Sequence, residues 1–248
     1  MIWIAVDAMG GDRAPVHIVD GALAAARHFD RLGVALVGPV ERLEAELARH
    51  GGVDRDRVRL VQADAVVDMA ESPAAALRRK PTASIRVAAE LVARGEAAAL
   101  FSAGHTGATV VAAHAAFGML PGVDRPALAA AVPTRREPAI LLDVGATIEC
   151  RPAHLLQFGV MGSVYARVGF GIAQPRVGLL SIGEEETKGN ELTREAHRLL
   201  KASSVCFIGN IEAREVYSGV ADVIVCDGFT GNIALKISEG LVEVVEGL

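Results

Sequence analysis

The sequence predicts an α/β fold, with helices covering both faces of a mostly parallel sheet in one three-layer α/β/α domain over residues 1–248. Short apolar runs rich in Val, Ile and Leu recur along the chain, and helical patterns lie between many of them, which is typical of βαβ units. The runs are apolar throughout, as strands covered on both faces require. The 248 residues, 51% of them hydrophobic, suffice to bury the core of such a domain.

The apolar runs give the predicted strands, in order 2–6, 34–37, 58–61, 97–101, 139–142, 177–181, 204–208 and 222–226. Residues 39–50 carry apolar side chains at helical spacing, such as Leu43 and Leu47, which predicts an amphipathic helix. Residues 106–117 are apolar nearly all round, which predicts a buried central helix. Another helix is predicted over 191–200.

The last residues, 233–248, repeat apolar side chains at helical spacing to the end of the sequence. These side chains are Ile233, Leu235, Ile237, Leu241, Val242, Val244, Val245 and Leu248. A helix with such a stripe needs a partner surface. The domain core, a second subunit and peripheral contact with a membrane all suit it, and the sequence leaves the three open.

Composition narrows the classes of function. The chain has 25 Lys and Arg against 30 Asp and Glu, a net charge of −5, which argues against nucleic-acid binding. Three cysteines without a C-x-x-C pair form neither a disulfide framework nor a zinc ribbon. The first residues lack the basic region and cleavage site of a signal peptide. We therefore expect a cytoplasmic protein that binds no nucleic acid.

Ligands of open α/β sheets bind at the carboxyl ends of strands, where loops lead into helices. The first such loop, residues 7–15, contains Gly10 and Gly11, which allow close approach of a ligand to the backbone, with Asp7 and Asp12 beside them. A tight turn with Asp12 as a helix cap is the alternative.

The second loop places glycines and hydroxyls at the start of the predicted helix 106–117, where free backbone N–H groups favour an anion. Its candidate residues are Ser102, Gly104, His105, Thr106 and Gly107. The alternative is a capped helix with glycines present for packing. His105 by itself is more often structural than a base.

Two further loops are less specific. Asp143 ends a strand, where aspartate is also a common turn former. Lys188 follows three adjacent glutamates, in a near miss of the P-loop spacing. This fourth loop is either a solvated segment with Asn190 capping the next helix, or one in which Lys188 points inward and the glutamates outward.

The fifth loop crowds polar side chains around two glycines at a helix start, with a cation one turn further on. Its residues are Asp227, Gly228, Thr230, Gly231, Asn232 and Lys236. Such a group can bind an anion or orient a polar substrate, whereas a purely structural turn rarely needs all of it. No dinucleotide fingerprint, nucleophile elbow or metal-ligand spacing occurs in the sequence, so we expect no cofactor and no metal ion.

Five segments, taken in order, resemble the acyl-ACP:phosphate acyltransferases, the PlsX family. They are residues 4–15, 102–108, 124–129, 177–180 together with 188–192, and 227–232, so the resemblance covers nearly the whole chain. It implies a fold similar to the isocitrate and isopropylmalate dehydrogenases, a homodimer, and attachment to the inner membrane surface in some members. It also implies transfer of a fatty acyl group from acyl carrier protein to inorganic phosphate, giving acyl phosphate for phospholipid synthesis.

By motif position, the resemblance implies phosphate and oxyanion contacts from residues 102–107 and 228–232, and charge compensation by Lys188. Asp227 would orient the substrate or handle a proton, and Asn232 would share in catalysis. The family usually has Asn at His105 and at Thr147, and it continues into a C-terminal segment with a His-Gly-Ser-Ser run that nothing here matches, so we expect that segment to be absent or truncated.

Two other classes of function stay open at this point. A catalytically impaired relative would bind acyl carrier protein or a partner subunit as a scaffold. Another enzyme of the same fold would transfer short acyl groups to phosphate.

Overall fold

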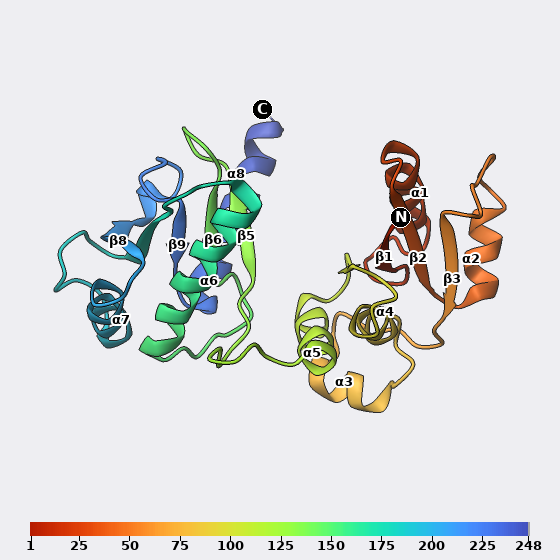
Figure 1. The fold of residues 1–248 in the computed structure, drawn as a ribbon, viewed down its shortest axis with the longest axis horizontal. Coiled ribbons are helices and arrows are strands. Elements are labelled where there is room, and N and C mark those ends of the chain that lie inside the picture. The colour runs from red at the N-terminus through yellow and green to blue at the C-terminus, as the bar shows by residue number, and fades with distance from the viewer. Residues whose placement is uncertain (248) are drawn as a thin grey trace. The chain divides into compact units, whose positions relative to one another are not determined.

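The computed structural model describes residues 1–247, and the chain divides into two compact units, Met1–Met119 (unit 1) and Leu120–Leu248 (unit 2). Each unit has its own sheet (Figure 1). The predicted α/β class with mostly parallel strands is confirmed. The strands lie in two sheets, not in the single sheet that was predicted. The alternation of strands and helices could not show this, because it does not specify which strands are neighbours. That both units belong to one acyltransferase domain stays a prediction.

Unit 1 contains a four-stranded parallel sheet in the order β3-β2-β1-β4. Its elements are β1 (Ile2–Asp7), α1 (Val16–His28), β2 (Leu32–Gly38), α2 (Val40–Leu47), β3 (Val58–Gln62), α3 (Pro73–Arg79), α4 (Ser84–Ala93), β4 (Ala99–Phe101) and α5 (Thr106–Phe117). Successive residues of β2 face opposite sides: Leu36 packs with α1 and α2, and Val37 packs with α4. Unit 1 is therefore built of three layers.

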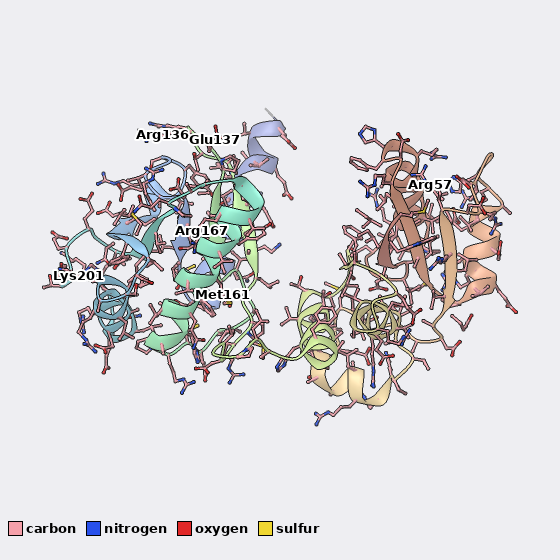
Figure 2. The ribbon with its side chains drawn as sticks, viewed as in Figure 1. Arg57, Arg136, Glu137, Met161, Arg167 and Lys201 are labelled. Carbon is pink, nitrogen blue, oxygen red and sulfur yellow. The ribbon has the colours of Figure 1, made fainter. Side chains whose placement is uncertain are left out.

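Trp3, the one tryptophan of the chain, lies on β1 between its neighbours in the sheet. Its ring lies against Gly33, where an added Cβ would come within 2.8 Å of a ring carbon. The guanidinium of Arg59 stacks 3.7 Å from the ring centroid. Arg57 (Figure 2) donates to the carbonyl of Leu32 at 3.2 Å and joins the start of β2 to the loop before β3.

The helix predicted over 106–117 forms as α5, but the prediction that it is buried was wrong. Two of its residues, Ala108 and Ala112, are buried, and the Phe117 side chain is exposed. Alanine raises the hydrophobicity of a segment while presenting little surface, so an alanine-rich helix can lie at the surface at small cost.

Unit 2 contains a five-stranded sheet in the order β5-β6-β9-β7-β8, with β5 antiparallel to β6 and the other pairs parallel. Its elements are β5 (Ala129–Val132), β6 (Ala139–Leu142), α6 (Pro152–Phe170), β7 (Arg176–Ser181), α7 (Glu191–Lys201), β8 (Cys206–Glu212), the 3-10 turn η1 (Ala213–Glu215), β9 (Val223–Val225) and α8 (Gly228–Glu246). Helices α6 and α7 cover one face of the sheet.

The predicted C-terminal helix is α8, which begins earlier than expected, at Gly228. Leu235 packs against the core of unit 2, but most of the predicted stripe is exposed. The exposed members are Ile233, Ile237, Leu241, Val242, Val244 and Val245, and Leu248 lies outside the described residues. Among residues 1–247 there is no helix whose length and apolar character would let it cross a bilayer.

Candidate functional site

The first and second predicted loops meet in unit 1, because they leave neighbouring parallel strands, β1 and β4, at the same edge of the sheet. The Ser102 hydroxyl donates to Asp7 Oδ2 at 2.7 Å and accepts from the backbone N–H of Gly104 at 3.1 Å. Two residues 95 positions apart in the chain thereby form one polar pair.

Glycines make this meeting of loops sterically feasible. A Cβ on Gly10 would lie 2.5 Å from Asp7 Oδ2, and one on Gly104 would lie 2.9 Å from the Cα of Gly10. Gly11 has a φ of 107°, a conformation that favours glycine. The two backbones therefore approach more closely than any other residue type would permit.

Asp7 leaves one carboxylate oxygen without a partner. The residue is 3% exposed, and among residues 1–247 its Oδ1 has no hydrogen-bond partner. Asp7, Gly10, Ser102, Gly104 and His105 border a small cavity. An unpaired buried acceptor is unfavourable, so this oxygen is a ready acceptor for one donor group of a ligand or for a water molecule.

Other residues of these loops have local roles. His105 caps α5, because its Nδ1 accepts from the Gly107 N–H at 3.1 Å. This leaves Thr106 exposed at the first position of the helix. Asp12 is exposed and does not cap α1, which begins at Val16 without a side-chain cap, so the capping alternative for Asp12 was wrong.

In unit 2, the third loop is organised by a buried carboxylate. Asp143 Oδ1 accepts from the backbone N–H groups of Leu128, Gly145 and Ala146 at 2.9–3.1 Å, and its Oδ2 accepts from Thr147 N at 2.6 Å. Asp143 is 0% exposed and backbone donors occupy both of its oxygens, so its role is to hold the loop backbone in place.

The fifth loop packs on the third, because β9 and β6 are neighbouring strands. The Gly228 N–H donates to Thr147 O at 2.9 Å, and a Cβ on Gly231 would lie 1.9 Å from Asp143 O. The exposed Asn232 side chain lies beside Gly145, with its Oδ1 3.5 Å from where a Cβ on that glycine would stand.

Asp227 caps α8: its Oδ1 accepts from Thr230 N at 2.9 Å and its Oδ2 from Thr230 Oγ1 at 2.7 Å. Lys236 forms an ion pair with Glu239 at 2.6 Å, within the same helix. Asp227 thus contacts another predicted site residue, Thr230, whereas Lys236 pairs with Glu239, which lies outside the predicted set.

The fourth loop follows β7, the neighbour of β9, and presents Lys188 to solvent. The preceding glutamates are exposed as well, so the structure does not have the inward orientation considered for Lys188. Asn190 caps α7 by accepting from Thr193 N at 2.9 Å, as the capping alternative predicted. Within residues 1–247 no carboxylate lies at ion-pair distance from Lys188, so its ammonium group is free to meet a ligand.

Cys150 lies beneath the third and fifth loops, where its thiol donates to Thr147 O at 3.3 Å. Burial, with the nearby carboxylates of Asp143 and Asp227 adding to it, raises the pKa of the Cys150 thiol to about 11. The thiol is thus protonated at neutral pH and is a poor nucleophile there.

The sequence analysis missed an apolar cavity in unit 1. It has a volume of about 380 Å³ and lies between α1 and the sheet, lined by Ile4, Val6, His17, Ile18, Gly21, Ala22, Ala25, Leu32, Val34 and Phe101. The sequence did contain a signal for this cavity: the small residues Gly21, Ala22 and Ala25 lie on one side of α1. They leave open a space against the strands that larger side chains would fill. Phe101 directly precedes Ser102 of the second loop.

The fold and loops define an α/β protein with polar, glycine-rich loops at the carboxyl ends of parallel strands. Solved structures with a similar fold include the EutD phosphotransacetylase from Staphylococcus aureus, with a TM-score of 0.68 and 18% identity over 98% of this chain and 82% of that one. A 4-hydroxythreonine-4-phosphate dehydrogenase from Burkholderia phymatum gives a TM-score of 0.56, with 18% identity over 96% of this chain and 83% of that one.

The chain belongs to the family described as "Fatty acid synthesis protein", whose sequence model it matches over residues 2–248. A phosphate acyltransferase of Pelotomaculum thermopropionicum is 54% identical over 240 residues, covering 96% of this chain and 69% of the relative. A phosphate acyltransferase of Geobacter sulfurreducens is 50% identical over 242 residues, covering 98% of this chain and 69% of the relative.

Proposed function

We propose that this protein transfers a long-chain fatty acyl group from acyl carrier protein to inorganic phosphate, forming acyl phosphate for phospholipid synthesis. The observation that carries the proposal is the identity of 54% and 50% to relatives named phosphate acyltransferase, each over at least 96% of this chain. We further propose that it acts in the cytoplasm, where acylated carrier protein and phosphate would be its partners.

The reaction needs electrostatic assistance more than a covalent nucleophile. A phosphate oxygen attacks the thioester carbonyl, the new C–O bond forms, and the C–S bond breaks to release the carrier thiolate, which takes up a proton. A thiol with a pKa of roughly 8.5 is a good leaving group, so little acid catalysis is required. The protein must hold a dianion and stabilise the developing oxyanion against competition from water.

The loops of unit 2 offer suitable groups for these tasks. Lys188 lies on an exposed loop, and its ammonium group pairs with no carboxylate among residues 1–247. Asn232 lies exposed in the first turns of α8, where its amide and the helix N-terminus favour an anion. We assign charge compensation to Lys188 and a polar substrate contact to Asn232, with Asp227 and Asp143 as positioning residues that hold the loops.

The apolar cavity of unit 1 suits the acyl chain. Its lining is mostly aliphatic, and one of its lining residues, Phe101, directly precedes Ser102 in the chain. Burial of each methylene group of an acyl chain contributes about 0.8 kcal/mol. We propose that this cavity binds part of the chain and favours long-chain donors over short ones.

The deciding experiment supplies long-chain acyl carrier protein, phosphate and the full chain, and traps acyl phosphate with hydroxylamine as a hydroxamate. Hydroxylamine also attacks thioesters, so the matched control omits phosphate and its hydroxamate is subtracted. We expect phosphate-dependent hydroxamate with a long acyl chain. Product from short-chain acyl-CoA alone would instead identify a short-chain phosphotransacylase. Carrier binding without any product would identify a scaffold.

A further inference from the structure

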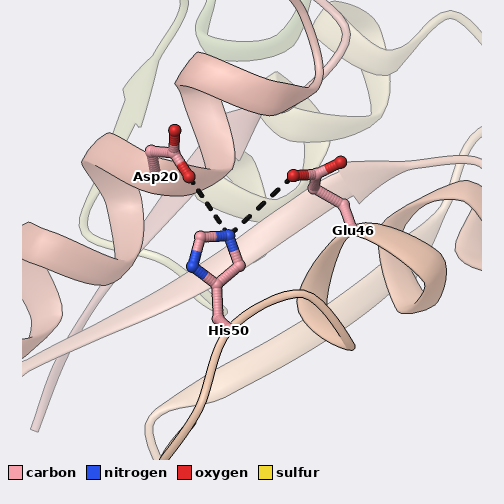
Figure 3. Close-up of side chains that lie close together, drawn as sticks. All are labelled: Asp20, Glu46 and His50. Carbon is pink, nitrogen blue, oxygen red and sulfur yellow. Dashed lines mark ion pairs between the residues drawn. The ribbon is translucent and has the colours of Figure 1, made fainter.

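The first two helices of unit 1 hold a group of ionisable side chains that the proposed reaction does not use. Asp20 lies on α1, Glu46 lies near the end of α2, and His50 follows α2 (Figure 3). His50 Nε2 lies 3.1 Å from Asp20 Oδ1 and 3.9 Å from Glu46 Oε1. The three donor atoms all lie within 4.8 Å of one another.

The ring nitrogen at the centre of this group is not satisfied. His50 Nε2 is buried and makes no hydrogen bond among residues 1–247, although Asp20 Oδ1 is close, because the two are poorly aligned for one. Figure 3 shows the nitrogen facing the gap between the two carboxylates. A ring nitrogen that faces a gap flanked by carboxylate oxygen atoms can act as a ligand to a metal ion in that gap.

Glu46 is also unusually placed for a glutamate, with 7% exposure. Its Oε2 is held by Arg49 Nη1 at 3.0 Å, and this contact leaves Oε1 to face His50. Asp20 closes the site from the other helix, and 47% of its side chain is exposed, so an ion could reach the gap from solvent.

We propose that Asp20, Glu46 and His50 bind a divalent transition-metal ion, with Zn²⁺ the best match. Tetrahedral zinc with ligand bonds of about 2.0–2.2 Å places its ligand atoms roughly 3.3–3.6 Å apart. The distances from His50 Nε2, 3.1 and 3.9 Å, lie on either side of this value. One imidazole and two carboxylates form a donor set that zinc accepts, and water would complete the coordination. The ion would link α1 to the end of α2 and stabilise unit 1.

Isothermal titration of the chelator-treated full chain with a zinc salt tests the proposal. We expect one Zn²⁺ per chain, with binding at least tenfold weaker in His50→Asn and in Asp20→Asn. Two matched controls should bind as the wild type does: His28→Asn, at the exposed end of α1, and Glu41→Gln, exposed on α2. The thermal midpoint should rise with zinc in the wild type and controls but not in the two site variants.

The proposal is wrong if the wild type takes up no zinc, or if His50→Asn and Asp20→Asn bind it as tightly as the wild type. In that case the three residues form a polar cluster that needs no metal ion. Circular dichroism identifies any variant that fails to fold, and Asp20, whose side chain is half exposed, gives a substitution that the fold should tolerate.

Discussion

Lys188 is the side chain whose loss we expect to reduce catalysis while leaving the fold intact. It is exposed, and no carboxylate among residues 1–247 pairs with it. Replacing Lys188 with alanine should lower the rate of acyl-phosphate formation by about tenfold to a thousandfold, the range for one lost transition-state contact. The measurement is the rate of phosphate-dependent hydroxamate formation.

Lys201 provides the matched control for this variant. It is an exposed lysine of the same unit, lies at the end of α7 (Figure 2) and pairs with Glu186. Alanine at Lys201 should leave turnover close to that of the wild type. Unchanged turnover in Lys188→Ala would remove this residue from the site.

Single residues also mark the limit of prediction from sequence. The cap formed by Asn190 could be predicted because a side chain and the next helical turn are neighbours in sequence. The Ser102–Asp7 pair could not, because strand order brings together residues 95 positions apart. Glycine-rich composition also could not distinguish a ligand loop from the close packing found at Gly231.

At the scale of elements, Arg176 and Asp222 join the start of β7 to the segment before β9. Two side-chain hydrogen bonds of 2.9 and 2.7 Å and one from the Arg176 backbone N–H of 2.7 Å reach the Asp222 carboxylate. Burial raises the pKa of Asp222, but the hydrogen bonds from Arg176 outweigh it, so the net pKa is lowered.

We expect Asp222→Asn to lower the free energy of unfolding by about 2 kcal/mol at neutral pH, because the hydrogen bonds to a charged acceptor are lost. A carboxyl with a lowered pKa stabilises the fold above its ordinary value of 3.8 and loses this effect as pH falls through the lowered value. Urea titrations at several pH values should therefore show the difference from wild type shrinking only below pH 3.8.

The control for Asp222 is Glu195→Gln, which removes an exposed ion pair of 2.6 Å with Arg198. Because solvent screens this exposed pair, its loss should lower the free energy of unfolding much less than the loss of the Asp222 carboxylate does. Equal effects of the two substitutions would contradict the role given to Asp222.

The apolar cavity predicts a chain-length effect for a substitution on α1. A Cβ added at Gly21 meets no atom within 4 Å, so Gly21→Phe should fold and place its ring in the cavity. Displacing two methylene groups of an acyl chain costs about 1.6 kcal/mol, which corresponds to a decrease of roughly tenfold in kcat/KM. We expect kcat/KM to fall about tenfold for long-chain donors and to change little for short ones.

Ala24→Phe controls for a bulky residue on the same helix, because Ala24 is exposed and does not line the cavity. If Gly21→Phe and Ala24→Phe have the same kcat/KM for long-chain donors, the cavity does not hold the acyl chain.

Elements could be predicted from sequence where the side chains themselves carry the signal. Runs such as Ala139–Leu142 are strands because their apolar side chains need burial on both faces. The antiparallel edge strand Ala129–Val132 was not predicted, because three of its four residues are alanines and carry no strand signal. Alanine also explains why α5 was wrongly expected to be buried, because it raises the hydrophobicity of a helix while presenting little surface.

At the scale of the whole molecule, α8 favours association of two copies of the chain. The helix has an exposed stripe of apolar residues. It also carries a net negative charge, because its sequence contains Glu239, Glu243 and Glu246 but one cation, Lys236. A net negative helix is repelled by the anionic surface of a membrane, so a second subunit fits the stripe better than lipid. We propose a homodimer formed through α8.

Light scattering after size-exclusion chromatography tests this proposal. We expect the mass of a dimer for the wild type and of a monomer for a variant that combines Leu241→Asp with Val245→Asp. Val168→Asp, which changes another exposed apolar residue, on α6, should leave the dimer intact. A wild-type monomer that floats with anionic vesicles would support the lipid interface instead.

The stacking of Trp3 under Arg59 gives unit 1 an optical label of its own. Because Trp3 is the one tryptophan in the chain, its fluorescence follows the unfolding of unit 1, whereas far-ultraviolet circular dichroism records the helices of both units. A single urea titration read by both signals compares the two. Coincident midpoints mean one cooperative transition, and separate midpoints mean that the units unfold in turn.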